Sequence, residues 1–136
     1  MLTELEIKKI MSVYKKSWKN KDTSILPNIF TENAIYREKA FGMPMRGLSE
    51  IIRYWDEKVV QGQDNINFEL IAIYIDGNTA IVEWDVKFDD LTRKVRKHLK
   101  EIAVLKINNG KISSLHEYWD SEVISDIGIE YKEDNY

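Results

Sequence analysis

The sequence has no cysteine, which excludes disulfide bonds, thiolate nucleophiles, cysteine zinc sites and iron–sulfur clusters. It has only two histidines, His98 and His116, too few for an imidazole-rich metal site. Basic residues are not in excess, because 20 Lys and Arg stand against 23 Asp and Glu, and a nucleic-acid binder is normally basic. No apolar run reaches membrane-spanning length, and the first nine residues lack the apolar core of a signal peptide. We therefore expect a cytoplasmic protein without a metal site that binds neither nucleic acid nor a membrane.

The residues that are present indicate one globular domain. Hydrophobic residues make up 43% and charged residues 32% of 136 positions, which suits a single core of ordinary size. Residues 121–136 carry five carboxylates against one lysine and lack clear periodicity. We predict a domain over residues 1–120 and an acidic, partly ordered tail over 121–136.

Helices are predicted in the first half of the chain. Thr3 and Glu6 form a capping-box pattern, and apolar residues then recur at helical spacing: Ile7, Ile10, Met11, Tyr14 and Trp18. A short second helix is expected after the potential caps at 22–24. A third helix is expected to begin after Gly47 and to end at residues 61–63.

The second half of the chain has the pattern of an antiparallel sheet. Turn signals at 76–78 and 108–110 separate runs rich in β-branched and aromatic residues, predicting strands over 66–75, 79–88, 95–107 and 111–119. A further short strand is expected at 34–39, between the second and third helices.

Several short motifs, in this order, resemble the SnoaL-like and ketosteroid isomerase-like branch of the nuclear transport factor 2-like superfamily. They are Phe30-Thr-Glu-Asn-Ala34, Phe41-Gly42-x-Pro44-x-x-Gly47, the helix from Ile51 to Trp55, and the final strand from Gly110-Lys-Ile112 to Tyr118-Trp119. The resemblance implies an α+β, cone-shaped fold, also called a cystatin-like α+β barrel. In this fold three N-terminal helices pack in the concavity of a curved, mainly antiparallel β-sheet.

The resemblance also implies an apolar cavity at the open end of the cone, and strand parity then assigns the residues that face it. With Trp119 inward, parity places Glu101, Ala103, Leu115, Glu117 and Trp119 on the inner face. The aromatic residues Trp18, Phe41, Trp55 and Trp84 are also expected to line the cavity. The same parity turns Ile102, Val104, His116 and Tyr118 to the outer face of the sheet. Since apolar residues on an outer face need a cover, we expect a homodimer through this face.

Tyr14 and Glu38 are the expected catalytic residues, because the resemblance aligns them with a tyrosine that binds the substrate oxygen and a carboxylate that moves a proton. The same resemblance aligns Ala103 with a second oxyanion-binding acid of the isomerases, which implies that half of that arrangement is missing unless Glu101 or Glu117 replaces it. Three carboxyl groups around one cavity would repel one another and keep at least one protonated, so that it donates to a ligand oxygen.

Three functions remain open from the sequence. The first is an enzyme of the isomerase or cyclase type that moves a proton beside a carbonyl of a small, largely apolar, cyclic molecule, chemistry that needs no cofactor. The second is a non-catalytic protein that binds such a molecule in the same cavity. The third is a protein-interaction module, because this fold alone does not imply catalysis.

Overall fold

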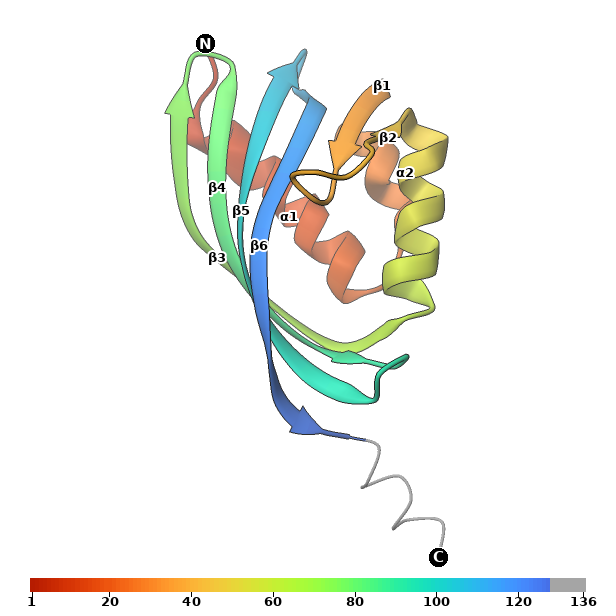
Figure 1. The fold of residues 1–136 in the computed structure, drawn as a ribbon. Helices are drawn as coiled ribbons and strands as arrows, with labels where there is room; N and C mark the ends of the chain where they lie inside the picture. The colour runs from red at the N-terminus through yellow and green to blue at the C-terminus, as the bar shows by residue number, and fades with distance from the viewer. Residues whose placement is uncertain (128–136) are drawn as a thin grey trace, which may run out of the picture.

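The computed structural model describes residues 1–127 as two main helices, two short helical turns and one six-stranded sheet (Figure 1). The elements are α1 Glu4–Lys19, η1 Thr23–Asn28, β1 Phe30–Arg37, β2 Met45–Arg46, α2 Leu48–Trp55, η2 Asp56–Val60, β3 Gln63–Asp76, β4 Thr79–Asp90, β5 Val95–Asn108 and β6 Lys111–Asp126.

The first helix begins where the capping pattern predicts. The Thr3 hydroxyl accepts a hydrogen bond from the backbone N–H of Glu6 at 3.2 Å, which satisfies one amide that the helix leaves unpaired. The predicted apolar stripe is buried along its whole length, together with Ser17. Burial of this stripe fixes α1 against the sheet.

The other two helices differ from simple α-helices. Thr23–Asn28 forms a 3₁₀ helix with Pro27 inside it, because proline has no N–H to bond the carbonyl of Thr23 in an α-helical turn. The third helix is α-helical only over Leu48–Trp55 and then widens into a π-helical turn, η2. This turn ends with a hydrogen bond of 3.0 Å from the Gln61 N–H to the Asp56 carbonyl.

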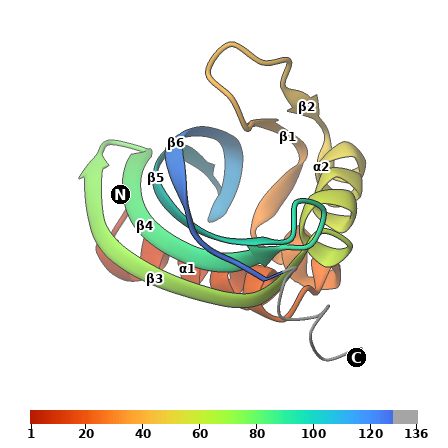
Figure 2. The same ribbon diagram turned by 60° about the horizontal axis from the view of Figure 1, so that its bottom comes forward.

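The sheet has the strand order β2-β1-β6-β5-β4-β3. Strands β3 to β6 form the predicted antiparallel hairpins, whereas β1 pairs in parallel with β6 and antiparallel with the short β2. Figures 1 and 2 show the strongly bent sheet, with α1 running across it and α2 beside β1. This is an α+β fold with a curved, mainly antiparallel sheet, as expected.

The last strand is longer than the sequence pattern predicts. Residues 121–126 lie in β6, where Ser121 pairs with Leu99 and Asp126 pairs with Val95, so the expected tail does not start at 121. The long β5 offers a complete hydrogen-bonding edge, and this edge compensates for the weak apolar alternation of residues 121–126. Residues 128–136 of the expected tail lie outside the described residues.

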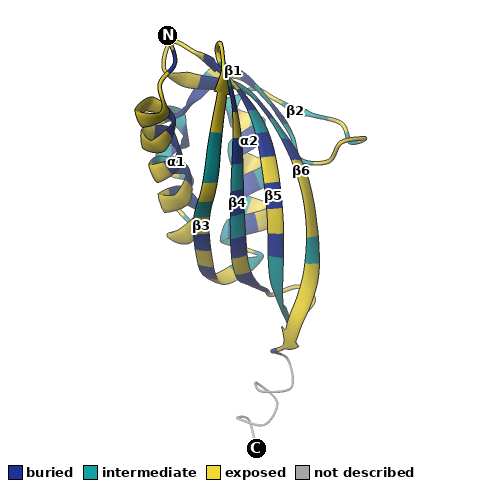
Figure 3. Cartoon of the chain, turned by 90° about the vertical axis from the view of Figure 1, so that its left-hand side faces the viewer, coloured by how far each residue is buried: buried dark blue, intermediate teal, exposed yellow. Residues whose placement is uncertain are grey.

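The two faces of the sheet differ in burial (Figure 3). Along β5, Leu99, Glu101, Ala103, Leu105 and Ile107 are buried on the inner face, and the residues between them are exposed or half-buried on the outer face. Two glutamates thus lie among core residues, Glu101 on β5 and Glu117 on β6. Carboxyl groups are seldom buried, and those that are often belong to functional sites, so this part of the core is a candidate site.

Candidate functional site

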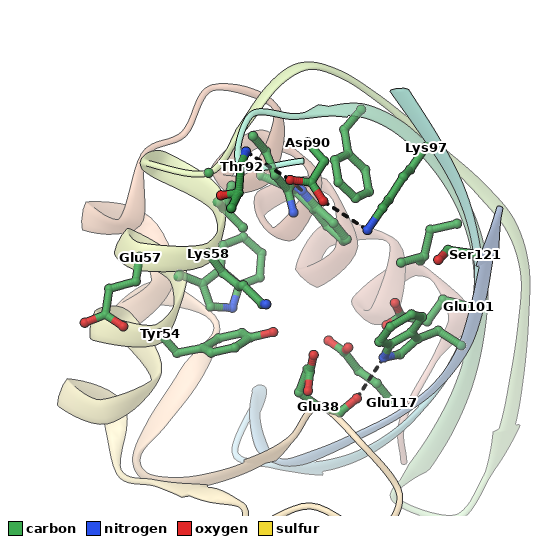
Figure 4. A pocket seen from close by; sticks show the side chains of 18 of the residues that line it. Glu38, Tyr54, Glu57, Lys58, Asp90, Thr92, Lys97, Glu101, Glu117 and Ser121 are labelled. Atoms are coloured by element: carbon green, nitrogen blue, oxygen red, sulfur yellow. Dashed lines mark hydrogen bonds and ion pairs between the residues drawn. The ribbon is translucent and has the colours of Figure 1, made fainter. Parts of the chain in front are cut away.

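A cavity of about 400 Å³ opens at the end of the cone where α2 and η2 approach the ends of β4, β5 and β6 (Figure 4). Its apolar walls come from Trp18, Trp55, Val59, Phe88, Leu99 and Trp119. The volume suits a small organic molecule, and the mixture of aromatic walls with a few polar groups is typical of ligand sites.

Two carboxyl groups lie together at the inner end of this cavity. In the register of β5 and β6, Glu101 pairs with Trp119 and Ala103 pairs with Glu117, so the two glutamates are diagonal neighbours on the same face. Their exposed fractions are only 3% and 6%. One oxygen of Glu101, Oε2, is buried and has no hydrogen-bond partner among the described residues. An unsatisfied buried oxygen is free to bond a ligand.

A chain of tyrosines supports this carboxyl pair. The Tyr36 hydroxyl donates a hydrogen bond to Oε1 of Glu117, and it lies 3.3 Å from the hydroxyl of Tyr14. All three side chains come from different elements, namely β1, β6 and α1. The arrangement fixes the Glu117 carboxyl in one orientation, and Tyr14 lies close enough to lower the pKa of Glu117 as well.

The surroundings favour the protonated form of the carboxyl pair. Burial raises the pKa of Glu117 from 4.5 to about 8, the Tyr36 hydrogen bond opposes this rise, and the charge of Glu38 adds to it. Burial, followed by the charge of Glu117, likewise raises the pKa of Glu101. At neutral pH the pair therefore retains a proton that it can donate.

The tyrosines around the pair remain protonated for the same reason. Burial, followed by the charge of Glu117, raises the pKa of Tyr14, Tyr36 and Tyr54. Their hydroxyl groups are hydrogen-bond donors at every physiological pH.

Glu38 reaches the cavity from the residue just after β1. The indole N–H of Trp119 donates a hydrogen bond of 2.9 Å to the backbone carbonyl of Glu38, which ties this segment to β6. Figure 4 shows the Glu38 side chain beside Glu117, with the Tyr54 hydroxyl directed toward it. A third carboxylate thus shares the cavity with the buried pair.

The structure brings together six of the residues that the sequence analysis selected. Trp18, Glu38, Trp55, Glu101, Glu117 and Trp119 line the cavity. Tyr14, Trp84, Ala103 and Leu115 are fully buried in the core and do not line it. Phe41 is 106% exposed and also does not line it, because the β1–β2 loop projects away from the cone (Figure 2).

The sequence analysis missed several residues that line the cavity, among them two tyrosines of the site, Tyr36 and Tyr54. Tyr36 lies two positions before Glu38 in an extended segment, so strand parity places both side chains on one face and could have identified Tyr36 as a cavity residue. Tyr54 precedes Trp55 in α2 and lines the cavity beside it. The widened π-helical turn after Trp55 had no such signal, because its geometry depends on packing.

Other kinds of site find no support in residues 1–127. His98 bonds Asp85 on the outer face of the sheet, with Nε2 to Oδ2 at 3.1 Å, and neither histidine lines the cavity. Within this range no cluster of three or more His, Asp or Glu side chains is arranged to hold a metal ion. No helix in the described part of the chain is both long enough and apolar enough to span a membrane.

Solved structures with the same fold include enzymes. SalBIII, an epoxide hydrolase/cyclase-like enzyme of pyran ring formation in the polyether salinomycin, has a TM-score of 0.77 and 20% identity, over 91% of this chain and 100% of its own. The LEH-like epoxide hydrolase of M. tuberculosis has a TM-score of 0.70 and 15% identity, over 85% and 84%. A protein from Catenulispora acidiphila with a ketosteroid isomerase-like fold has a TM-score of 0.71 and 16% identity, over 87% and 88%. At these identities the likeness shows the fold alone.

The sequence itself identifies the family. No curated protein matches the chain significantly. A model of the SnoaL-like domain, however, matches residues 13–115, which contain the end of α1, the strands β1 to β5 and the start of β6. With the curved sheet and the cavity of the cone, this match places the chain in the SnoaL-like domain family.

Proposed function

We propose that the protein is an enzyme of the isomerase or cyclase type that moves a proton beside a carbonyl group of a small, largely apolar, cyclic molecule. The observation that carries the proposal is the buried Glu101–Glu117 pair at the inner end of an aromatic cavity. A carboxyl group kept neutral at physiological pH is a general acid, and a buried site makes its hydrogen bond to a developing oxyanion strong.

The roles of the side chains follow from their positions. The substrate carbonyl oxygen accepts a hydrogen bond from the protonated carboxyl of the pair, at the unpartnered Oε2 side of Glu101. The carboxylate of Glu38 removes a proton from the adjacent carbon, and the electron pair of that C–H bond moves to the oxygen as an enolate. If the substrate carries a C=C bond between the β- and γ-carbons, the enolate is conjugated with it, and Glu38 returns the proton to the γ-carbon. The double bond then lies between the α- and β-carbons, the carbonyl is restored, and the isomerisation is complete.

The tyrosines act as positioning groups in this scheme. Tyr36 holds the Glu117 carboxyl through its hydroxyl, and Tyr14 holds Tyr36. The sequence analysis assigned Tyr14 to the substrate oxygen, but its side chain has 0% exposure and does not line the cavity. In the proposal the acid pair therefore replaces Tyr14 as the partner of the substrate oxygen.

Several solved relatives are consistent with acid–base chemistry. SalBIII is described as epoxide hydrolase/cyclase-like and the M. tuberculosis protein as an epoxide hydrolase. Opening of an epoxide also needs an acid at an oxygen, so the proposed general acid suits that wider class of reactions.

Deuterium exchange tests the proposal without knowledge of the natural substrate. The protein is incubated in D₂O with a panel of cyclic ketones, and deuterium uptake beside the carbonyl is followed by NMR. We expect uptake faster than in buffer for at least one ketone. We expect Glu38→Gln and Glu117→Gln each to slow it roughly 100-fold or more, the usual size of a general acid–base contribution.

Glu69→Gln is the matched control, because Glu69 is an exposed carboxylate on the outer face of β3. It should leave the exchange rate unchanged. Calorimetric binding of a ketone without exchange above the buffer rate would contradict catalysis and leave a binding protein. Equal exchange by the wild-type protein and both cavity variants would contradict the assigned roles.

A further inference from the structure

The cavity has a different charge at its mouth than at its inner end. Four cationic side chains line it toward the solvent, Lys39, Lys58, Arg93 and Lys97. Lys97 is neutralised, because its Nζ lies 3.0 Å from Oδ2 of Asp90. Lys58 forms no ion pair with any residue of the range 1–127. Although Glu57 and Asp90 also line the cavity, Lys58 therefore keeps an ammonium group that no described carboxylate engages in an ion pair.

Lys58 is held over the cavity by the π-helical turn. Figure 4 shows its side chain directed toward the cavity, whereas the neighbouring Glu57 is turned away from it. The Lys58 carbonyl packs closely against Gly62, where an added Cβ would lie only 2.6 Å from its oxygen. π-Helical turns are frequent at functional sites, where they aim a side chain that a regular helix would point elsewhere.

A second unpartnered donor lies in the same wall. Trp55 is 2% exposed and lines the cavity, and its indole Nε1 is buried without a hydrogen-bond partner among the described residues. Trp55 is the last residue of α2 and Lys58 follows in η2, and both line the cavity. An indole N–H only donates, so what it lacks is an acceptor.

We propose that the mouth of the cavity binds a carboxylate group of the substrate through the ammonium of Lys58 and the indole N–H of Trp55. The inference rests on the proposed function, since the carbonyl of the same substrate occupies the acid pair. It narrows the substrate class to small cyclic carbonyl compounds that carry a carboxylate at the end opposite the reacting carbonyl. The two donors match the two oxygens of a carboxylate.

Two ligands of the same shape test the inference by isothermal titration calorimetry. The first is 6-hydroxy-2-naphthoate, whose phenol mimics an enol at the acid pair and whose carboxylate reaches the mouth. The second is 6-hydroxy-2-naphthamide, which is neutral and has an NH₂ in place of one oxygen. We expect the carboxylate to bind roughly tenfold tighter, the contribution of one charge-assisted hydrogen bond.

Variants assign this preference to the two residues. Lys58→Met keeps an apolar side chain of similar length, and Trp55→Phe keeps an aromatic wall without the N–H. Both should weaken carboxylate binding about tenfold, with a much smaller effect on the amide in Lys58→Met. Lys9→Met, on the exposed side of α1, is the control and should preserve the full preference.

The possible failures are distinguishable. Equal affinity of the wild-type protein for both ligands, or a full carboxylate preference in Lys58→Met, would overturn the inference and leave the proposed function standing. Binding of neither ligand would overturn both, because the cavity would then not accept a phenol at its acid pair. A carboxylate preference that depends on Lys58, in a protein without deuterium exchange, would support the anion site and contradict catalysis.

Discussion

At the scale of single residues, the main feature is a pair of buried carboxyl groups, whose ionisation burial makes unfavourable. Glu101 and Glu117 lie on adjacent strands with exposed fractions of 3% and 6%, and Tyr36 supplies a hydrogen bond to Glu117. Hydrogen bonding to the charged form opposes the effect of burial, so Tyr36 tunes the acidity of the pair as well as its orientation.

Removing the Tyr36 hydroxyl should make Glu117 a weaker acid. In Tyr36→Phe the Glu117 carboxyl loses a donor that stabilises its charged form, so we expect its pKa to rise further. The hydroxyl of Tyr14 loses its partner as well, and the free energy of unfolding should fall by about 1–3 kcal/mol. Carbon-13 NMR titration measures the pKa, and urea denaturation measures the stability.

Tyr74→Phe is the control for this prediction, because Tyr74 is 60% exposed on β3. It should change neither quantity. A Glu117 pKa that stays the same or falls in Tyr36→Phe would show that the hydroxyl does not stabilise the carboxylate.

The carboxyl pair should also make the protein less stable at higher pH. The pKa of Glu117 is about 8 in the folded protein and near 4.5 when exposed, so between these values the folded state binds more protons than the unfolded state. The contribution of Glu117 to the free energy of unfolding is complete below about pH 4.5 and is lost as the pH rises through about 8. Each pKa unit of difference corresponds to about 1.4 kcal/mol.

Urea denaturation across this pH range measures the slope. Glu117→Gln removes the titrating group and should flatten the pH dependence, whereas Glu69→Gln should leave it as in the wild-type protein. Wild-type stability that rises from about pH 5 to about pH 8 would contradict the raised pKa values.

At the scale of elements, the end of the third helix determines the wall of the cavity. The chain passes from α2 into the π-helical turn η2 and leaves it at Gly62, whose position admits no Cβ without displacement of the Lys58 carbonyl. A side chain at residue 62 would therefore change both the turn and the direction of Lys58.

Gly62→Ala should be destabilising, by about 1–3 kcal/mol, the usual cost of a steric insertion into a packed region. It should also reduce the preference for the carboxylate ligand, because Lys58 would move. Gly42→Ala is the control, since its new Cβ would meet Lys39 Cβ at 3.3 Å in an exposed loop that can adjust. Denaturation and calorimetry measure the two effects, and a Gly62→Ala protein like the wild type in both would disprove the steric argument.

At the scale of the whole molecule, the outer face of the sheet carries an apolar patch. Ile81 pairs with Val104, and Ile102 pairs with Tyr118 in the next row of the sheet. Ile81, Ile102 and Tyr118 are between 38% and 50% exposed. A homodimer through this face remains a prediction, and exposed apolar patches of this kind are typical of protein interfaces.

A charge in this patch should prevent association. We expect sedimentation analysis to show a dimer for the wild-type protein and a monomer for Ile102→Lys, because an unpaired lysine would lose its hydration in an apolar interface. Leu5→Lys is the control, since Leu5 is 62% exposed on α1 away from the sheet. A monomeric wild-type protein, or a dimeric Ile102→Lys, would rule out this interface.

The sequence by itself determined the local elements and the faces of the strands. The cap at Thr3, the apolar stripe of α1 and the glycines of both hairpin turns are local signals, so the first helix and the four long strands followed directly. Alternation along β5 and β6 placed Glu101 and Glu117 on one inner face, because the side-chain period of a strand is fixed at two.

Only the tertiary structure decided how these faces meet. It buried Tyr14 behind Tyr36, left Phe41 exposed in a loop, extended β6 to Asp126 and widened the helix after Trp55 into a π-helical turn. These features depend on contacts between residues far apart in the chain, such as Tyr36 with Glu117 across 81 positions. A periodic pattern states which side of an element is buried, but the depth of each side chain and the mouth of the cavity are set by the curvature of the sheet and the packing of α2 against it.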